Sequence, residues 1–134
     1  MFELGLGGES TATLDKEGYW YLASVYSKWA PRLDEACDLV SRLAGKFITA
    51  GVPVFSPIAH SHTIAMAAGI DPLSHEIWMP ADKPMVDNAV GMIVAKMEKW
   101  WTSKGIAQEI IWFTEHGKPI WYLNLEDLQL KQGN

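Results

Sequence analysis

Residues 89–95 read AVGMIVA, an uninterrupted apolar run that decides the fold class of this chain. A short continuous apolar run is typical of a strand that is covered on both faces. Strands of that kind occur in parallel sheets that carry helices on each side. We therefore expect AVGMIVA to be a central strand of a parallel sheet.

Three other segments have the composition of strands in the same sheet. Residues 19–25, YWYLASV, and residues 119–124, PIWYLN, combine aromatic and β-branched side chains. The shorter segment VPVFS, at 52–56, is a further strand along the chain. We expect AVGMIVA to lie between YWYLASV and PIWYLN.

Helical patterns separate these strands. Pro31 opens an apolar stripe at three- and four-residue spacing, and Gly51 ends it. Further helices are expected at 58–69 and at about 103–116. Strands that alternate with helices predict a three-layer α/β fold, Rossmann- or flavodoxin-like. It would have about four to five parallel strands and helices on both faces.

The remaining segments are expected to be less regular. Prolines interrupt residues 70–81, so we expect mostly loop there, followed by a short helix near 82–89. Residues 125–131, LEDLQLK, are expected to form a terminal helix. Residues 1–17 are rich in Gly, Ser and Thr and lack periodicity, which predicts a flexible N-terminal arm before a single domain at 18–134.

Composition excludes several classes of function. The chain has 134 residues, 49% of them hydrophobic, which suffices for one core, and its net charge of −5 argues against binding a nucleic acid polymer. No apolar stretch approaches the roughly 20 residues of a membrane helix, and the first residues do not resemble a signal peptide. The single cysteine, Cys37, excludes an internal disulfide within one chain and fits a reducing cytoplasm.

Seven tryptophans are many for a chain of this length. Tryptophan is enriched at protein interfaces, so one interpretation is a homo-oligomer, a dimer or a tetramer. A Trp-rich core with a few exposed rings is the equally weighted alternative.

Polar residues gather where the predicted strands end. In a parallel sheet the ligand crevice lies past the carboxyl ends of the strands. Residues 24–28, residues 56–62 and the segment after AVGMIVA would therefore meet at one crevice. The last of these contains Ser103, Gly105 and, about two turns further along the helix, Glu109.

This arrangement suits the cleavage of an N-glycosidic bond. The reaction builds positive charge on the sugar, which the carboxylate of Glu109 would stabilise or trap covalently. A second acid must protonate the leaving base. A helix start with free N–H groups suits a phosphate, and Ser103 and Gly105 offer a hydroxyl and an unobstructed approach.

Four motifs occur in order and carry a resemblance. They are YLASVYS, VFSPIAHSH, Trp78 with Asp82, and VGMIVAKMEKWWTSKGIAQEI. Together they resemble a family of uncharacterised bacterial and phage domains. Tyr21, Asp82 and the spacing from Ser103 through Gly105 to Glu109 are further similar to the nucleoside 2-deoxyribosyltransferase-like superfamily, which also holds deoxynucleotide N-glycosidases.

The resemblance implies roles for individual residues. Glu109 would be the nucleophile, Tyr21 would orient it, and Asp82 would transfer a proton to the base. Ser103 and the helix start would bind a phosphate or the 5′ end of a nucleoside or nucleotide, with no cofactor. The other residues expected at the substrate are Ser24, Ser27, Ser56, His60, His62, Trp78 and Gly105.

Alternative interpretations stay open. Superfamily members usually carry a second Asp where this chain has Val90, with Asp87 three residues earlier, which favours a non-catalytic nucleotide-binding module. Ser103 and Asp82 also suit helix N-caps, and Glu109 suits a solvated helix position. Tyr21 also suits a packed strand aromatic. A purely structural role, built on the tryptophans, is a further alternative.

The pair His60 and His62 raises a different hypothesis. In an extended segment two such imidazoles would face the same way and could hold a metal, with Asp82 or His75 completing the ligands of a metallohydrolase. His-x-His alone is a weak signal. We therefore rank this hypothesis below two others, the lining of a polar pocket and a helix start with one His hydrogen-bonded, and expect no metal.

Overall fold

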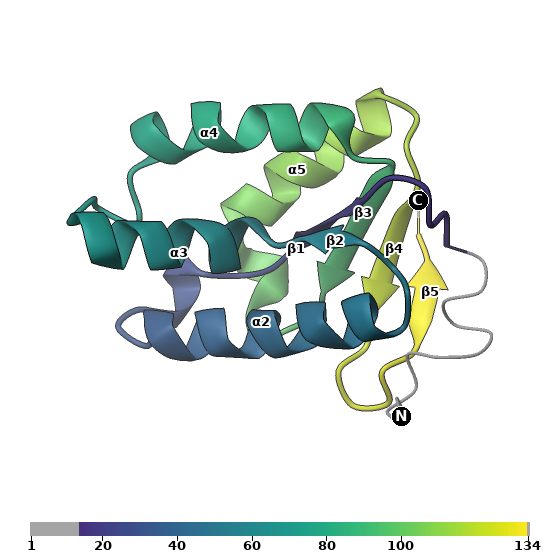
Figure 1. Cartoon of the computed structure of the whole chain (residues 1–134), viewed down its shortest axis with the longest axis horizontal. Coiled ribbons are helices and arrows are strands. Elements are labelled where there is room, and N and C mark those ends of the chain that lie inside the picture. Colours follow the sequence, from purple (N-terminus) through teal and green to yellow (C-terminus); the bar gives the residue numbers. More distant parts are fainter. Residues whose placement is uncertain (1–13, 134) are drawn as a thin grey trace.

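The computed structural model of the chain describes residues 14–133 and contains a five-stranded sheet with four helices (Figure 1). The strand order is β2-β1-β3-β4-β5, and only β5 runs antiparallel to its neighbour. The predicted α/β class is confirmed.

The strands are β1 Trp20–Ala23, β2 Val54–Phe55, β3 Gly91–Ala95, β4 Ile120–Leu123 and β5 Leu130–Gln132. The helices are α2 Leu33–Thr49, α3 Pro57–Ala68, α4 His75–Asn88 and α5 Lys104–Glu115, with 3-10 turns η1 Ser27–Trp29 and η2 Trp100–Thr102.

Strand β3 is the central strand that the apolar run predicted. It pairs in parallel with β1 on one side and with β4 on the other. All five of its residues are buried. The strand begins at Gly91, where a Cβ would clash with the Trp20 ring and lie 2.7 Å from the carbonyl oxygen of Pro119. A glycine therefore lets β3 fit closely between its neighbours.

The connections reverse direction between β1 and β3. The chain leaves β1 through α2 for β2 on one side, and it returns through α3 and α4 to β3 on the other side. Figure 1 shows α2 and α5 on opposite sides of the strands, as right-handed crossovers in opposite directions require. A reversal of this kind opens a crevice past the carboxyl ends of the two strands.

Local sequence signals set the helix boundaries near the site. Ser56 caps α3 by accepting a hydrogen bond from the Ala59 N–H at 3.1 Å, and Pro57 occupies the first turn. Ser103 caps α5 in the same way, accepting from the Ile106 N–H at 3.1 Å. Helix α2 begins two residues after Pro31, at Leu33, rather than at the proline.

The prediction of mostly loop at 70–81 is wrong, because α4 already begins at His75 and continues through Pro80 and Pro84. Each proline lacks a backbone N–H, so the helix loses one backbone hydrogen bond at that position. The fixed φ of proline nevertheless suits a helix. The carbonyls that lose their donors belong to Glu76 and Pro80, which are exposed, so water can satisfy them. Only Val86 of α4 is buried, so the helix lies on the surface.

The predicted terminal helix at 125–131 is also wrong. The chain turns after β4, with the Asn124 side chain accepting a hydrogen bond from the Glu126 N–H at 2.8 Å. Leu128 adopts a left-handed conformation with φ 56°, which no continuous helix allows. The chain then returns as β5, which pairs with β4 and covers its open edge.

Most of the predicted N-terminal arm, residues 1–13, lies outside the described residues. The described part of the arm, residues 14–17, packs against the domain: Leu14 is buried in the core, and the Asp15 carbonyl accepts a hydrogen bond from the Trp20 indole at 2.8 Å. The seven tryptophans are mostly at least half-buried, and Trp101 alone is strongly exposed. A single folded chain thus accommodates six of them. Among the described residues, no helix has the length and apolar character needed to cross a membrane.

Candidate active site

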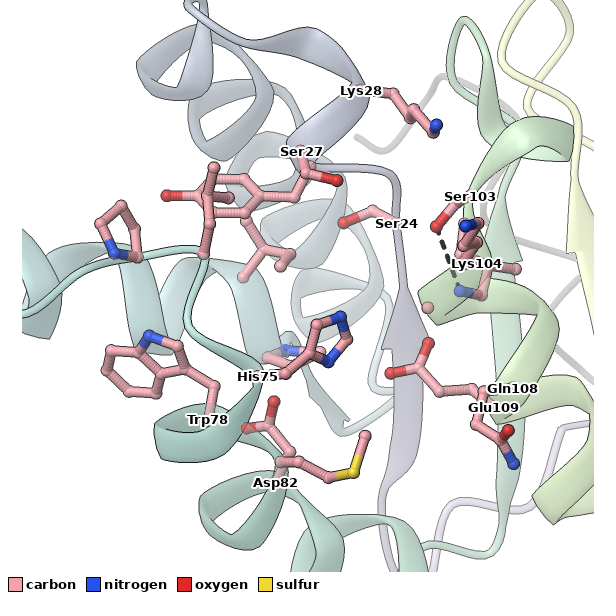
Figure 2. Close-up of a pocket in the computed structure, with 18 of the residues that line it drawn as sticks. Ser24, Ser27, Lys28, His75, Trp78, Asp82, Ser103, Lys104, Gln108 and Glu109 are labelled. Carbon is pink, nitrogen blue, oxygen red and sulfur yellow. Dashed lines mark hydrogen bonds between the residues drawn. The ribbon is translucent and has the colours of Figure 1, made fainter.

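A cavity of about 520 Å³ opens where the predicted crevice was expected, past the end of β1 and against the start of α5 (Figure 2). Its size is ordinary for a small-molecule site. Four segments form it: the end of β1 with the turn after it, the start of α3, the loop and first turns of α4, and the first half of α5 with its N-cap. The polar residues that line it are Tyr21, Ser24, Tyr26, Ser27, Lys28, Ser74, His75, Asp82, Ser103, Lys104, Gln108 and Glu109.

Tyr21 and Glu109, which both line the cavity, are joined by a hydrogen bond. The Tyr21 hydroxyl donates to Glu109 Oε2 at 2.6 Å, although 88 residues separate them along the chain. Tyr21 is fully buried, with its ring 5.7 Å from the ring of Phe113 on α5. Its position is therefore fixed by packing, and it orients the carboxylate of Glu109.

The pKa of the Glu109 carboxyl is raised to about 7, mainly by burial. The hydrogen bond from Tyr21 opposes the shift by favouring the carboxylate, and the charge of Asp82 contributes to it. Burial, followed by the nearby charge of Glu109, also raises the pKa of Tyr21, so the phenol keeps its proton and acts as a donor.

Asp82 faces this pair from α4, and Figure 2 shows it across the cavity from Glu109. Burial raises the pKa of the Asp82 carboxyl to about 6, with the charge of His60 acting in the opposite direction. The cavity therefore holds two carboxyl groups from different helices, each less acidic than usual. Such pairs are typical of catalytic sites.

The other end of the cavity is suited to an anion. The first N–H groups of α5 lack partners within the helix and carry its positive dipole end. Lys28 and Lys104 line the same end, as Figure 2 shows. Ser24, only 8% exposed, also lines the cavity, and its hydroxyl is the one buried side-chain oxygen or nitrogen in residues 14–133 without a hydrogen-bond partner. The Ser24 hydroxyl therefore has hydrogen-bonding capacity that no described residue uses.

The structure brings most of the predicted site residues together. Eight of them line the cavity: Tyr21, Ser24, Ser27, Trp78, Asp82, Ser103, Gly105 and Glu109. Three do not line it. Ser56 is the buried cap of α3, His60 is exposed on α3 with its ring 5.5 Å from that of Phe55, and His62 is buried behind Tyr26.

His60 and His62 both lie in helix α3, in agreement with the helix expected at 58–69, and not in the extended segment that the metal hypothesis requires. Positions two apart on a helix point in roughly opposite directions, so the two imidazoles do not converge on one ion. Within residues 14–133, no group of three or more His, Cys, Asp or Glu side chains could hold a metal. The metallohydrolase hypothesis thus has no ligand set in the described part of the chain.

Several residues that line the cavity are not among those predicted from the sequence. Tyr26 and Lys28 belong to the turn after β1, which the strand pattern located but did not resolve residue by residue. His75 was considered only as a metal ligand, because the start of α4 was interpreted as loop. Gln108 and Trp112 flank Glu109 on α5, so a helical projection from Glu109 would have found them.

Val90, the position of the missing Asp, lies just before β3 at its amino end, and it does not line the cavity. Asp87 pairs instead with Lys83 at 2.7 Å on the outside of α4. Neither Val90 nor Asp87 lines the cavity.

The protein is thus an open α/β sheet with a cavity at its topological switch point, and two carboxyl groups line this cavity. The chain belongs to the family described as a Domain of unknown function (DUF1937), whose model matches residues 18–124. A comparison with curated proteins finds no match.

Proposed function

We propose that this protein handles nucleosides or nucleotides and cleaves the N-glycosidic bond, by hydrolysis or by deoxyribosyl transfer. The observation that carries the proposal is the 2.6 Å hydrogen bond from Tyr21 to Glu109, with Asp82 facing it in the same cavity. The resemblance to the nucleoside 2-deoxyribosyltransferase-like superfamily supports the same assignment.

Glu109 is the nucleophile or charge stabiliser in this proposal. Breaking the bond between sugar and base leaves positive charge on the sugar, which a neighbouring carboxylate lowers in energy or captures as a covalent ester. Tyr21 holds the carboxylate of Glu109 in one orientation. Its hydroxyl donates a hydrogen bond to Glu109 Oε2, which favours the charged form of the carboxyl group. The buried surroundings strengthen the attraction between carboxylate and sugar.

Asp82 is the acid that protonates the leaving base. The pKa of the Asp82 carboxyl is raised to about 6, so a larger share of it carries a proton near neutral pH than of an ordinary aspartate. The pKa of about 7 for Glu109 means that Glu109 must lose its proton before it can act as the nucleophile, and the hydrogen bond from Tyr21 favours that charged form.

The anion end would bind the 5′ end of the substrate. Ser24 and the first N–H groups of α5 supply donors, and Gly105 carries no side chain to block approach. Lys28 and Lys104 add positive charge. On the opposite wall Trp78 lines the cavity, with its indole held by the Asp71 carbonyl at 2.9 Å, and it offers a fixed aromatic face to a base.

The alternative roles of the proposed catalytic residues fit less well. Asp82 lies within α4, seven residues after its start, so it is no N-cap. Glu109 is half-buried and bonded to Tyr21, so it is not a solvated helix residue. Ser103 does cap α5, and this occupies its hydroxyl as an acceptor while leaving the O–H free to donate.

A substrate screen tests the proposal. Purified protein is incubated with the common 2′-deoxynucleosides and ribonucleosides and with their 5′-monophosphates, and free base is measured by chromatography. We expect base release from at least one of them, with 5′-monophosphates preferred. Saturable binding without release would instead favour the non-catalytic nucleotide-binding module, and neither binding nor release would contradict both.

A further inference from the structure

A second hydrogen-bonded chain runs from the cavity wall to the surface, and the proposed reaction does not use it. The Tyr26 hydroxyl lies 2.6 Å from His62 Nδ1. On the other side of the ring, His62 Nε2 lies 2.7 Å from Asp34 Oδ1. The three residues come from the turn after β1, from α3 and from the first turn of α2, so tertiary packing alone brings them together.

The chain passes from a buried end to an exposed one. Tyr26 and His62 are each 7% exposed, whereas the Asp34 side chain is 90% exposed. Tyr26 is also one of the residues that line the cavity. A surface carboxylate is therefore connected to the cavity wall through one buried imidazole.

The donor at each link follows from the chemistry of the groups. A carboxylate only accepts hydrogen bonds, so His62 Nε2 carries the hydrogen that is shared with Asp34. A neutral imidazole has one N–H, which leaves Nδ1 as an acceptor. Burial raises the pKa of Tyr26 to about 12, so the phenol retains its proton and donates it to Nδ1. The phenolic oxygen is then left with lone pairs only.

We propose that Tyr26 is a ligand-binding residue whose oxygen accepts a hydrogen bond from a sugar hydroxyl, and that Asp34 and His62 are the positioning residues that fix this polarity. The identity of the ligand rests on the proposed function. Tyr26 belongs to the same turn as Ser24 and Ser27 of the anion end, and the sugar of a 5′-nucleotide is the part next to its phosphate. A site built to accept from a hydroxyl discriminates against analogues that lack it.

The first experiment tests the polarity without any ligand. Long-range ¹H–¹⁵N correlation spectra of the imidazole rings distinguish a protonated ring nitrogen from an unprotonated one. The chain has four histidines, and His62→Gln identifies the signals of His62 by their loss. At neutral pH we expect Nε2 protonated and Nδ1 unprotonated. A proton on Nδ1, in either the other tautomer or the imidazolium, would overturn the inference.

Two surface substitutions on α2 provide a matched pair. In Asp34→Asn the amide group can donate to Nε2 as well as accept from it, so the imidazole hydrogen is no longer held on Nε2 and can move to Nδ1, where the Tyr26 oxygen accepts from it. The phenol hydrogen would then turn away from His62. Asp38→Asn, one turn further on α2, removes a carboxylate that pairs with Arg42 at 2.8 Å and does not touch His62. Both positions are exposed, so both variants should fold, and only Asp34→Asn should change the His62 spectrum.

The second experiment measures the consequence for binding. Isothermal titration compares each protein with a 2′-deoxynucleoside 5′-monophosphate and with its 2′,3′-dideoxy analogue, which lacks the sugar hydroxyl. For the wild type and Asp38→Asn we expect the dideoxy analogue to bind about five- to tenfold more weakly, the effect of one hydrogen bond. Tyr26→Phe should bind the two nucleotides about equally, and Asp34→Asn should lose discrimination to the extent that its spectrum shows the imidazole hydrogen on Nδ1.

The outcomes separate this inference from the proposed function. If the wild type binds neither nucleotide, the proposed function fails, and with it the assignment of the sugar hydroxyl. If nucleotides bind but Tyr26→Phe retains the wild-type discrimination, the inference alone is wrong. A loss of stability in Asp34→Asn with unchanged discrimination would likewise reduce the Asp34–His62–Tyr26 chain to a structural contact.

Discussion

Ser24 and Ser103 lie at the same end of the cavity, yet the structure uses their hydroxyls differently. Ser103 accepts from the Ile106 N–H at 3.1 Å and so stabilises the start of α5. The Ser24 hydroxyl is buried and has no partner among the described residues. The two serines therefore allow folding and ligand binding to be separated by single substitutions.

We expect Ser103→Ala to lower the free energy of unfolding by about 1 kcal/mol, since it removes an N-cap. Ser24→Ala should leave stability unchanged or slightly raised, because it removes an unsatisfied buried group. Urea unfolding measures both. In titrations with a nucleoside 5′-monophosphate, Ser24→Ala should weaken binding several-fold and leave binding of the parent nucleoside unaffected. Equal loss with both ligands would argue against an anion site at Ser24.

Some of the residues of the candidate site could be predicted from the sequence, and others could not. Glu109 could be predicted because a carboxylate in an apolar helix is conspicuous, whereas Tyr21 was identified through the resemblance to the superfamily. Their contact could not be predicted, because it spans 88 residues and depends on how α5 packs on β1. The role of His62 could not be predicted from the sequence either, since its partners Tyr26 and Asp34 come from two other elements.

At the scale of elements, β3 shows how composition alone places a strand. Its five buried residues leave no face for solvent, so only a central position satisfies them. Gly91 adds a steric condition that periodicity does not reveal, because its neighbours Trp20 and Pro119 come from other segments. The two wrong predictions lie at the surface, in α4 and β5, where local patterns were weak and tertiary pairing decided the outcome.

Gly91→Ala should be strongly destabilising, by about 2–3 kcal/mol, because its Cβ would overlap the Trp20 ring in a core without free space. Gly45→Ala is the matched control: it lies on the exposed face of α2, and nothing stands within 4 Å of its added Cβ. There the change should stabilise by up to about 1 kcal/mol. Thermal unfolding of the two variants beside the wild type measures the difference. Similar midpoints for both would show that β3 is not as closely packed as the structure indicates.

At the scale of the whole molecule, the order of strands explains why one cavity receives residues from four segments. The reversal between β1 and β3 leaves a gap past their carboxyl ends, and α4 and α5 close it from the sides. The fold class and the location of this crevice followed from the alternation of strands and helices. The shape of the cavity did not, because α4 was not recognised as the element that carries Asp82 into it.

The central claim is that Glu109 acts on the substrate, and its substitution tests that claim without endangering the fold. The raised pKa of Glu109, about 7, means that the folded state disfavours its charge. The stability that a raised carboxyl pKa provides is present below about pH 4.5 and is lost as the pH rises through about 7. Glu109→Gln has no carboxyl group to ionise, so its free energy of unfolding does not fall over this pH range. At pH 8 the variant should therefore be at least as stable as the wild type.

The most direct measurement is therefore kcat/KM for base release at pH 7, on the best substrate from the screen, for the wild type, Glu109→Gln and Glu115→Gln. Glu115 lies exposed near the end of the same helix and outside the cavity. We predict a loss of about a hundredfold or more for Glu109→Gln, since a nucleophile or charge stabiliser typically supplies several kcal/mol of the barrier reduction. Glu115→Gln should retain wild-type activity. Full activity in a folded Glu109→Gln variant would contradict the account.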